Sequence, residues 1–207
     1  MPDEKPDLPA PKAPPRGRST HQTATTRGTT MAEATITPEE KPPAIETDGM
    51  LQLWLAPKGA VADPHHPKAE ELTAEAVHPV TYGLTTEGFA TASEQAKGTD
   101  DRLTLPQIFE TLGKVTNTLD LTYVYTNDPL TTSAMDAAFG STGGDFEIYA
   151  RYAIANGTPL LAGQLLDVWP FRAGIPVKNP PVANERFTKT VTTAIQAPGV
   201  ITDAVLA

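Results

Sequence analysis

The 207-residue chain contains no cysteine, which excludes disulfide scaffolds, Cys-based zinc sites and thiol nucleophiles. Its apolar runs are only a few residues long, too short to span a membrane. Basic side chains are scarce, since 16 Lys and Arg stand against 25 Asp and Glu, a formal charge of −9. Proteins that grip nucleic-acid phosphates need clustered Lys and Arg. The sequence therefore predicts an acidic, thiol-free protein that does not bind nucleic acid tightly and does not insert into a membrane.

Aromatic residues are missing from residues 1–48, which hold nine of the 21 prolines and none of the 13 aromatics. Such a composition cannot bury enough apolar surface to offset the entropy of ordering the chain. We therefore expect residues 1–48 to be an extended or disordered Pro-rich arm unless it packs on a neighbour. Residues 49–207 are expected to form one domain. Met31 opens a stretch that reads like a natural start, so residues 1–30 are interpreted either as native or as an upstream extension.

Threonine, by contrast, is abundant: 21 of the 30 threonines follow residue 48, and threonine favours the half-exposed surface of a sheet. Residues 116–125 alternate strictly, which predicts a strand. One face carries Leu119, Leu121, Tyr123 and Tyr125, and the other carries Thr118, Asp120 and Thr122.

Residues 145–152 repeat this alternation and predict a second strand. Its inward residues are expected to be Phe146, Ile148, Ala150 and Tyr152, and its outward residues Glu147, Tyr149 and Arg151. Asn156 and Gly157 then supply a turn pair that tolerates positive φ, so residues 160–171 are predicted as the returning strand of a hairpin.

Further strands are predicted at residues 51–55, 80–84, 109–114 and 187–195, and short helices at 68–77 and 131–139, the second ending at Gly140. Residues 56–79 form a long, polar, proline-bearing connection, and we expect that either this connection or the N-terminal arm reaches a neighbouring molecule or lies along the outside of the assembly. Seven or more strands with one or two short helices indicate an all-β fold, an antiparallel sandwich or barrel.

No motif in the chain favours catalysis or a cofactor. His65 and His66 are bracketed by prolines and lack the spacing of a zinc site, so a solvated loop is the better interpretation. Residues 140–144 resemble a phosphate loop but have no lysine and lead into a strand, which favours a helix-to-strand connection. We therefore predict no catalytic, cofactor or metal site and no enzyme activity.

Four ordered motifs carry a resemblance to a known family: LTTEGF at 84–89, LDLTYVY at 119–125, DVWPFRAG at 167–174 and PPVANE at 180–185. With the sequence around them, they resemble the major tail (tail tube) proteins of long-tailed, non-contractile bacteriophages (siphophages). The match is closest to those of phages that infect actinobacteria. The Pro-rich arm matches no motif of the family.

The resemblance implies a structural virion protein whose β domains form six-membered rings that stack into a hollow tube. Its partners would be further copies of itself, a tape-measure protein, and the tail terminator and distal-tail proteins at the tube ends. The resemblance also implies assembly in the host cytoplasm, a place in the phage tail, and passage of genomic double-stranded DNA through the tube during genome ejection. It implies no cofactor.

Two sets of residues are candidates for these roles. DNA carries one charge per ~1.7 Å, so an acidic lumen would repel it within a Debye length of ~8 Å. The candidate lumen acids are Asp120, Asp145, Glu147 and Asp167. The candidate inter-subunit sheet face consists of Thr116, Thr118, Thr122, Thr188, Thr190 and Thr192.

Two other classes of function stay open at this point. The chain is alternatively another β-fold virion protein, such as a tail terminator, a distal-tail subunit or a capsid decoration protein. A β module that binds a carbohydrate or peptide is the remaining alternative. Polymer length and ligand binding discriminate between these hypotheses, because a terminator stops at one ring and a binding module stays monomeric.

Overall fold

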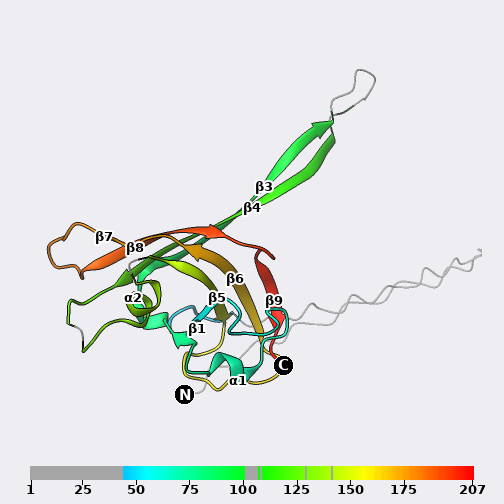
Figure 1. Ribbon diagram of the computed structural model, residues 1–207. Coiled ribbons are helices and arrows are strands. Elements are labelled where there is room, and N and C mark those ends of the chain that lie inside the picture. The colour runs from blue at the N-terminus through cyan, green and yellow to red at the C-terminus, as the bar shows by residue number, and fades with distance from the viewer. Residues whose placement is uncertain (1–43, 101–106, 108, 129, 141) are drawn as a thin grey trace, which may run out of the picture. The chain divides into compact units, whose positions relative to one another are not determined.

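Antiparallel strands build most of the domain in the computed structural model, which describes residues 44–100, 107, 109–128, 130–140 and 142–207 (Figure 1). Two short α-helices, α1 (Ala69–Leu72) and α2 (Ala134–Phe139), and one 3₁₀ turn (Thr81–Gly83) interrupt the strands. The strands are β1 (Leu51–Pro57), β2 (His78–Pro79), β3 (Leu84–Asp100), β4 (Phe109–Val124), β5 (Gly144–Tyr152), β6 (Leu165–Ala173), β7 (Val177–Lys178), β8 (Thr188–Ile195) and β9 (Ile201–Val205). The predicted all-β fold is confirmed. The arm predicted at residues 1–48 lies largely outside the described residues.

The strands form one nine-stranded sheet in the order β2-β1-β5-β6-β8-β4-β3, in which every pair is antiparallel. Strand β6 joins its two halves. The start of β6 pairs with β9, with Leu165 opposite Val205, and its end pairs with β8, with Phe171 opposite Ile195. We call β2-β1-β5-β6-β9 the first half-sheet and β7-β8-β4-β3 the second half-sheet.

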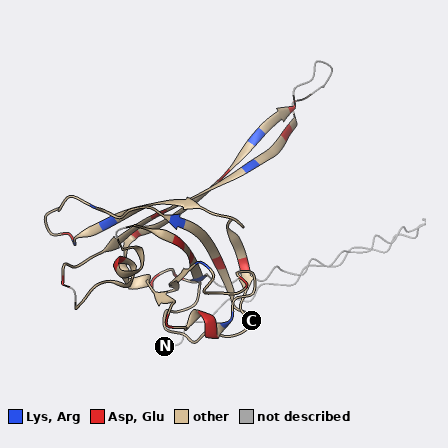
Figure 2. Cartoon of the chain, viewed as in Figure 1, with Lys and Arg blue, Asp and Glu red and all other residues tan. Residues whose placement is uncertain are grey.

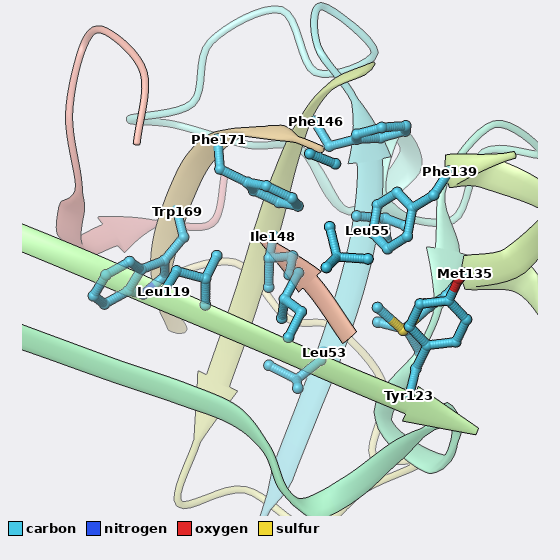
Figure 3. Packing of buried hydrophobic residues seen from close by; sticks show 14 of the residues in the cluster. Leu53, Leu55, Leu119, Tyr123, Met135, Phe139, Phe146, Ile148, Trp169 and Phe171 are labelled. Atoms are coloured by element: carbon cyan, nitrogen blue, oxygen red, sulfur yellow. The ribbon is translucent and has the colours of Figure 1, made fainter. Parts of the chain in front are cut away.

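The main hydrophobic core fills the space between the two half-sheets and is closed at one end by α2 (Figure 3). The predicted inward residues of β4 take part, because Leu119, Leu121 and Tyr123 are all buried. Helix α2 contributes Met135 and Phe139, and the Phe139 ring packs edge-on against Phe146 with 5.0 Å between centroids. Serine 133 caps α2 by accepting a hydrogen bond from the Asp136 N–H (3.2 Å), and the helix ends at Gly140 as predicted.

A second hydrophobic cluster covers the other face of the first half-sheet. Trp54, Tyr149 and Val168 from three adjacent strands pack there against Leu72 of α1 and Leu206 near the C-terminus. Two expectations are therefore wrong. Residues 56–79 are not a structureless loop, since they fold onto their own sheet. The second cluster also buries the face of β5 that was expected to point outward, including Glu147, Tyr149 and Arg151.

Other differences concern where strands begin and end. The strands predicted at 109–114 and 116–125 are one strand, β4, while residues 80–84 are mainly a 3₁₀ turn. Strands β3, β7 and β9 were not predicted. The β5–β6 pairing is antiparallel, with Ile148 opposite Trp169, but its loop runs to Gln164, so the returning strand starts at Leu165. Asn156 and Gly157 form a turn in that loop, with φ 85° at Gly157.

Candidate functional site

The exposed face of the second half-sheet gathers the predicted threonines. Thr122 lies directly opposite Thr190, and their hydroxyl oxygens are 3.1 Å apart. The side-chain NH₂ of Asn179 donates to the same Thr190 hydroxyl (3.0 Å) and to that of Thr188 (2.9 Å). By register and alternation, the same face carries the whole predicted set, Thr116, Thr118, Thr122, Thr188, Thr190 and Thr192. We call it the threonine face.

Of the four predicted lumen acids, two share this face. Asp120 is exposed and lies between Ala90 on β3 and Thr192 on β8. Asp145 continues the same face onto the first half-sheet, where it lies opposite Arg172. The Arg172 guanidinium donates two hydrogen bonds to the Asp145 carboxylate, Nε to Oδ1 (2.7 Å) and Nη2 to Oδ2 (3.0 Å). This hydrogen-bonded pair lowers the pKa of Asp145 below its ordinary value.

The other two acids lie elsewhere. Glu147 is only 4% exposed beneath the second cluster and accepts a 2.6 Å hydrogen bond from the Tyr149 hydroxyl. Burial, reinforced by this carboxylate, raises the pKa of Tyr149. Asp167 lies opposite Ala150 on the other face of the sheet, where its Oδ1 accepts the Asp203 N–H (3.1 Å). The expectation of an outward Glu147 is therefore wrong, because residues 58–77 cover a face that alternation alone leaves open.

The outer edge of the second half-sheet is open. Strand β3 pairs with β4 alone, so among the described residues no strand pairs with its outer edge over 17 residues. The edge on the other side is β7, which pairs only with Thr190 and Lys189 of β8. Long unpaired edges are templates for pairing with another chain, and proteins usually shorten or cover them. This sheet therefore offers two different edges to neighbouring molecules.

Beyond the core, β3 and β4 continue as a two-stranded arm (Figure 1). We define the arm as residues 92–100 and 109–116; both of its faces are almost entirely exposed. Leu112 is 71% exposed, and Phe109 and Val115 are exposed too. Lysine and acidic residues are interspersed along it, with Lys97 Nζ 3.0 Å from Glu110 Oε2 (Figure 2). Sequence reasoning predicted a strand at residues 109–114 but missed its partner at residues 92–100, which has no continuous apolar face.

An open hollow of about 610 Å³ lies where β3 begins and β4 ends, at the end of these strands away from the arm. Threonine, glutamate, asparagine and arginine side chains from β3, β4 and residues 184–188 line it. Gly88 in β3 permits this close approach of strands, because a Cβ there would lie 2.1 Å from the Thr122 carbonyl oxygen. Such a carbonyl cannot move aside without breaking the β3–β4 ladder.

The described residues were also compared with what a metal site and a membrane-spanning helix require. Within the described ranges, no group of three or more His, Cys, Asp or Glu side chains is placed to hold a metal ion. His66 pairs instead with Asp63, Nδ1 to Oδ2 at 3.1 Å on the surface. Among the helices of the described residues, none is long and apolar enough to cross a membrane.

Comparison with known proteins matches residues 38–207 to the family model described as phage tail tube protein. Among solved structures, the chain is similar to one in the cryo-EM structure of the anti-feeding prophage baseplate, 6-fold symmetrised. That similarity has 12% sequence identity and a TM-score of 0.41, and it covers 79% of this chain and 98% of that chain. No curated protein matches the chain in sequence.

Proposed function

Because this chain belongs to the phage tail tube protein family, we propose that it forms six-membered rings that stack into the tail tube of a siphophage. Family membership makes it a structural protein of the virion tail that assembles with itself and with other tail components. The observation that carries the finer proposal is the open edge of β3. We propose no enzymatic activity and no cofactor for this role.

Ring closure follows from the two different edges of the second half-sheet. When β3 of one subunit pairs with the β7–β8 side of the next, each contact joins unlike surfaces, and repetition by rotation closes a ring. Closing the sheets into one barrel leaves no open edge, which removes the aggregation hazard of β3. The barrel wall would then consist of the second half-sheets of all subunits.

The threonine face is the proposed lining of the lumen. Asp120 is exposed at its centre, and Asp145 on the same face is paired with Arg172. Lys178 and Lys189 lie opposite each other on the other face, where both ammonium groups stack on the Tyr125 ring. The lining would therefore be polar and weakly acidic, so DNA could slide past without being held. Asp167, on the opposite face, falls outside this lining.

The arm is the proposed contact between rings. A two-stranded hairpin is marginally stable at best when it stands alone in water, so the exposed arm needs a covering partner. Its β3 strand reaches about 30 Å beyond Thr91 at ~3.3 Å per residue, far enough to touch an adjacent ring. In this proposal the arm takes the role expected for residues 56–79, because residues 56–79 pack on their own domain. The tape-measure, terminator and distal-tail proteins remain proposed partners.

Electron microscopy of the concentrated, purified protein tests the proposal. Hollow tubes or stacked rings with six subunits per ring are expected. Single rings that never stack would instead indicate a terminator. Monomers that persist even with tape-measure protein present would overturn the tube assignment and favour a ligand-binding module. A variant lacking residues 93–115, with a short turn joining Ala92 to Thr116, should form rings but not stacks.

A further inference from the structure

Two exposed apolar patches of opposite charge lie at opposite ends of the segment that runs from the start of β6 to β7. The first, which we call the acidic patch, combines Tyr152, Leu165 and Val205 with Asp167 and Asp203. Leu165 is 50% exposed and lies directly opposite Val205. Tyr152 follows two residues after Ala150, the register partner of Asp167, so it falls on the same face as Leu165.

The acids of this patch have no basic partner in the part of the chain that the structure describes. Asp167 accepts only a backbone hydrogen bond, from the N–H of Asp203. Burial, reinforced by the negative charge of Asp167, raises the pKa of the nearby Tyr152 hydroxyl. The patch therefore combines three apolar side chains with two uncompensated carboxylates.

The second, which we call the basic patch, combines Tyr125, Phe187 and Lys178. Phe187 is 60% exposed, and its ring lies 6.2 Å from that of Tyr125. The two rings border a hollow of about 350 Å³. Lys178 Nζ lies 5.3 Å from the centre of the Tyr125 ring. Lys178 forms no ion pair with any carboxylate of the described residues.

One molecule cannot satisfy both patches with its own surface. The acidic patch lies at the first residue of β6 and the basic patch at β7 and the start of β8, and β6 alone spans about 30 Å at ~3.3 Å per residue. The rest of the domain is acidic, since residues 31–207 carry 11 basic and 22 acidic side chains. A cationic aromatic patch on such a chain is therefore suited to an acidic, apolar surface.

We propose that the acidic patch of one subunit docks on the basic patch of a second copy of this chain. The occupant of the hollow is the apolar row around Leu165, and the unpaired Lys178 approaches Asp167 and Asp203. Because the contact joins unlike surfaces, it repeats from one copy to the next instead of ending at a dimer. This inference rests on the proposed function and names a subunit contact separate from both the β3 edge and the arm.

The absence of cysteine makes the contact directly testable. Leu165→Cys and Phe187→Cys are prepared as separate single variants, assembled alone or as an equal mixture, and treated with a short bis-maleimide. This reagent tolerates geometries that a disulfide does not. A covalent dimer is expected in the mixture and not in either variant alone. The two single-variant samples are the matched controls, since they differ only in which patch carries the thiol.

The outcomes separate this inference from the tube proposal. Dimers within each single variant would indicate a symmetric contact and overturn the docking. Tubes seen by electron microscopy without cross-linked dimers would overturn the docking and leave the tube function intact. Failure of unmodified protein to assemble would overturn both. Lys178→Glu should raise the protein concentration needed for assembly about tenfold, whereas Lys58→Glu, outside both patches, should not.

Discussion

The Tyr123 hydroxyl donates a 3.0 Å hydrogen bond to Oδ1 of Asp136, which ties the centre of β4 to helix α2. The same carboxylate oxygen also accepts from Lys189 of β8. Burial, reinforced by the neighbouring carboxylate, raises the pKa of Tyr123. Three elements that close one end of the main core therefore meet at a single carboxylate.

Replacing Tyr123 with Phe should lower the free energy of unfolding by about 1 kcal/mol, the typical value of one hydrogen bond whose partner keeps another donor. Urea unfolding measures the change. Tyr82→Phe is the matched control, because that side chain is 85% exposed and its loss of a hydroxyl should have no measurable effect. Equal losses in the two variants would contradict this role for the Tyr123–Asp136 bond.

The Arg151 side chain anchors the β5–β6 loop through buried hydrogen bonds. Its guanidinium is fully buried and donates to Gln52 Oε1 (2.6 Å), Gln164 Oε1 (3.0 Å) and the carbonyls of Thr158 and Pro159. Arg151→Met should cost about 3 kcal/mol, since four acceptors lose this donor at once. Arg186→Met, at an exposed position, should stay within ~0.5 kcal/mol of the parent protein. Thermal unfolding of both variants gives the comparison.

Gly88 is required by space and not by backbone conformation. Gly88→Ala places a methyl group 2.1 Å from the Thr122 carbonyl oxygen, so β3 must shift away from β4. We expect a loss of about 3 kcal/mol or more, as for other overpacked sites. Gly83→Ala, where no atom lies within 4 Å of the added methyl group, is the paired control and should be close to neutral. A mild effect at position 88 would mean that the strands separate easily there.

The Asp145–Arg172 pair predicts a pH dependence. Its carboxyl pKa is lowered in the folded protein, so the pair stabilises the fold above the ordinary carboxyl pKa and that contribution is lost as the pH falls through the lowered value. Arg172→Gln should therefore be less stable than the parent protein at neutral pH, and the difference in stability should disappear once the pH falls below the lowered pKa of Asp145. Carboxyl titration by NMR should show Asp145 returning to its ordinary pKa in this variant. A gap that does not change with pH would exclude the ion pair as its cause.

Leu112 and Val115 should matter for assembly and not for the fold of one subunit. Changing both to Ser removes exposed apolar surface from the arm, which costs an isolated subunit almost nothing because neither side chain is buried. The protein concentration needed for tube formation, measured by light scattering, should rise about tenfold or more. As the control, Leu130→Ser changes a leucine off the arm that is even more exposed, at 91%. Equal effects of the arm and Leu130 variants would argue against a specific role for the arm.

Alternation predicted the strands that have one buried and one exposed face. It placed Leu119, Leu121 and Tyr123 correctly, and it collected the six threonines that share the face of Asp120. Alternation does not show when another segment of the chain buries the second face of a strand. The cluster around Trp54 buries the second face of β5. Glu147 and Arg151 are therefore buried, although alternation predicts that they are exposed.

The β3 strand of the arm escaped prediction for the opposite reason. A strand with no buried face shows no apolar periodicity, and residues 92–100 carry alanine, serine, glutamate and lysine in an order that favours no single structure. Its regularity comes from pairing with β4. Strand β9 was missed because its apolar residues, Ile201, Ala204 and Val205, do not alternate with polar ones.

Strand β6 bears hydrogen-bond ladders on both edges, β5 along one and β9 then β8 along the other. Antiparallel ladder bonds run perpendicular to their strands. A pull along β6 therefore loads all of them together in shear, whereas a pull across the strand opens the three-pair junction from Phe171 to Ala173 with β8 one bond at a time. The domain is accordingly stiff to tension in one direction and weak to peeling in the other, and its first mechanical failure should be separation of the two half-sheets at that junction.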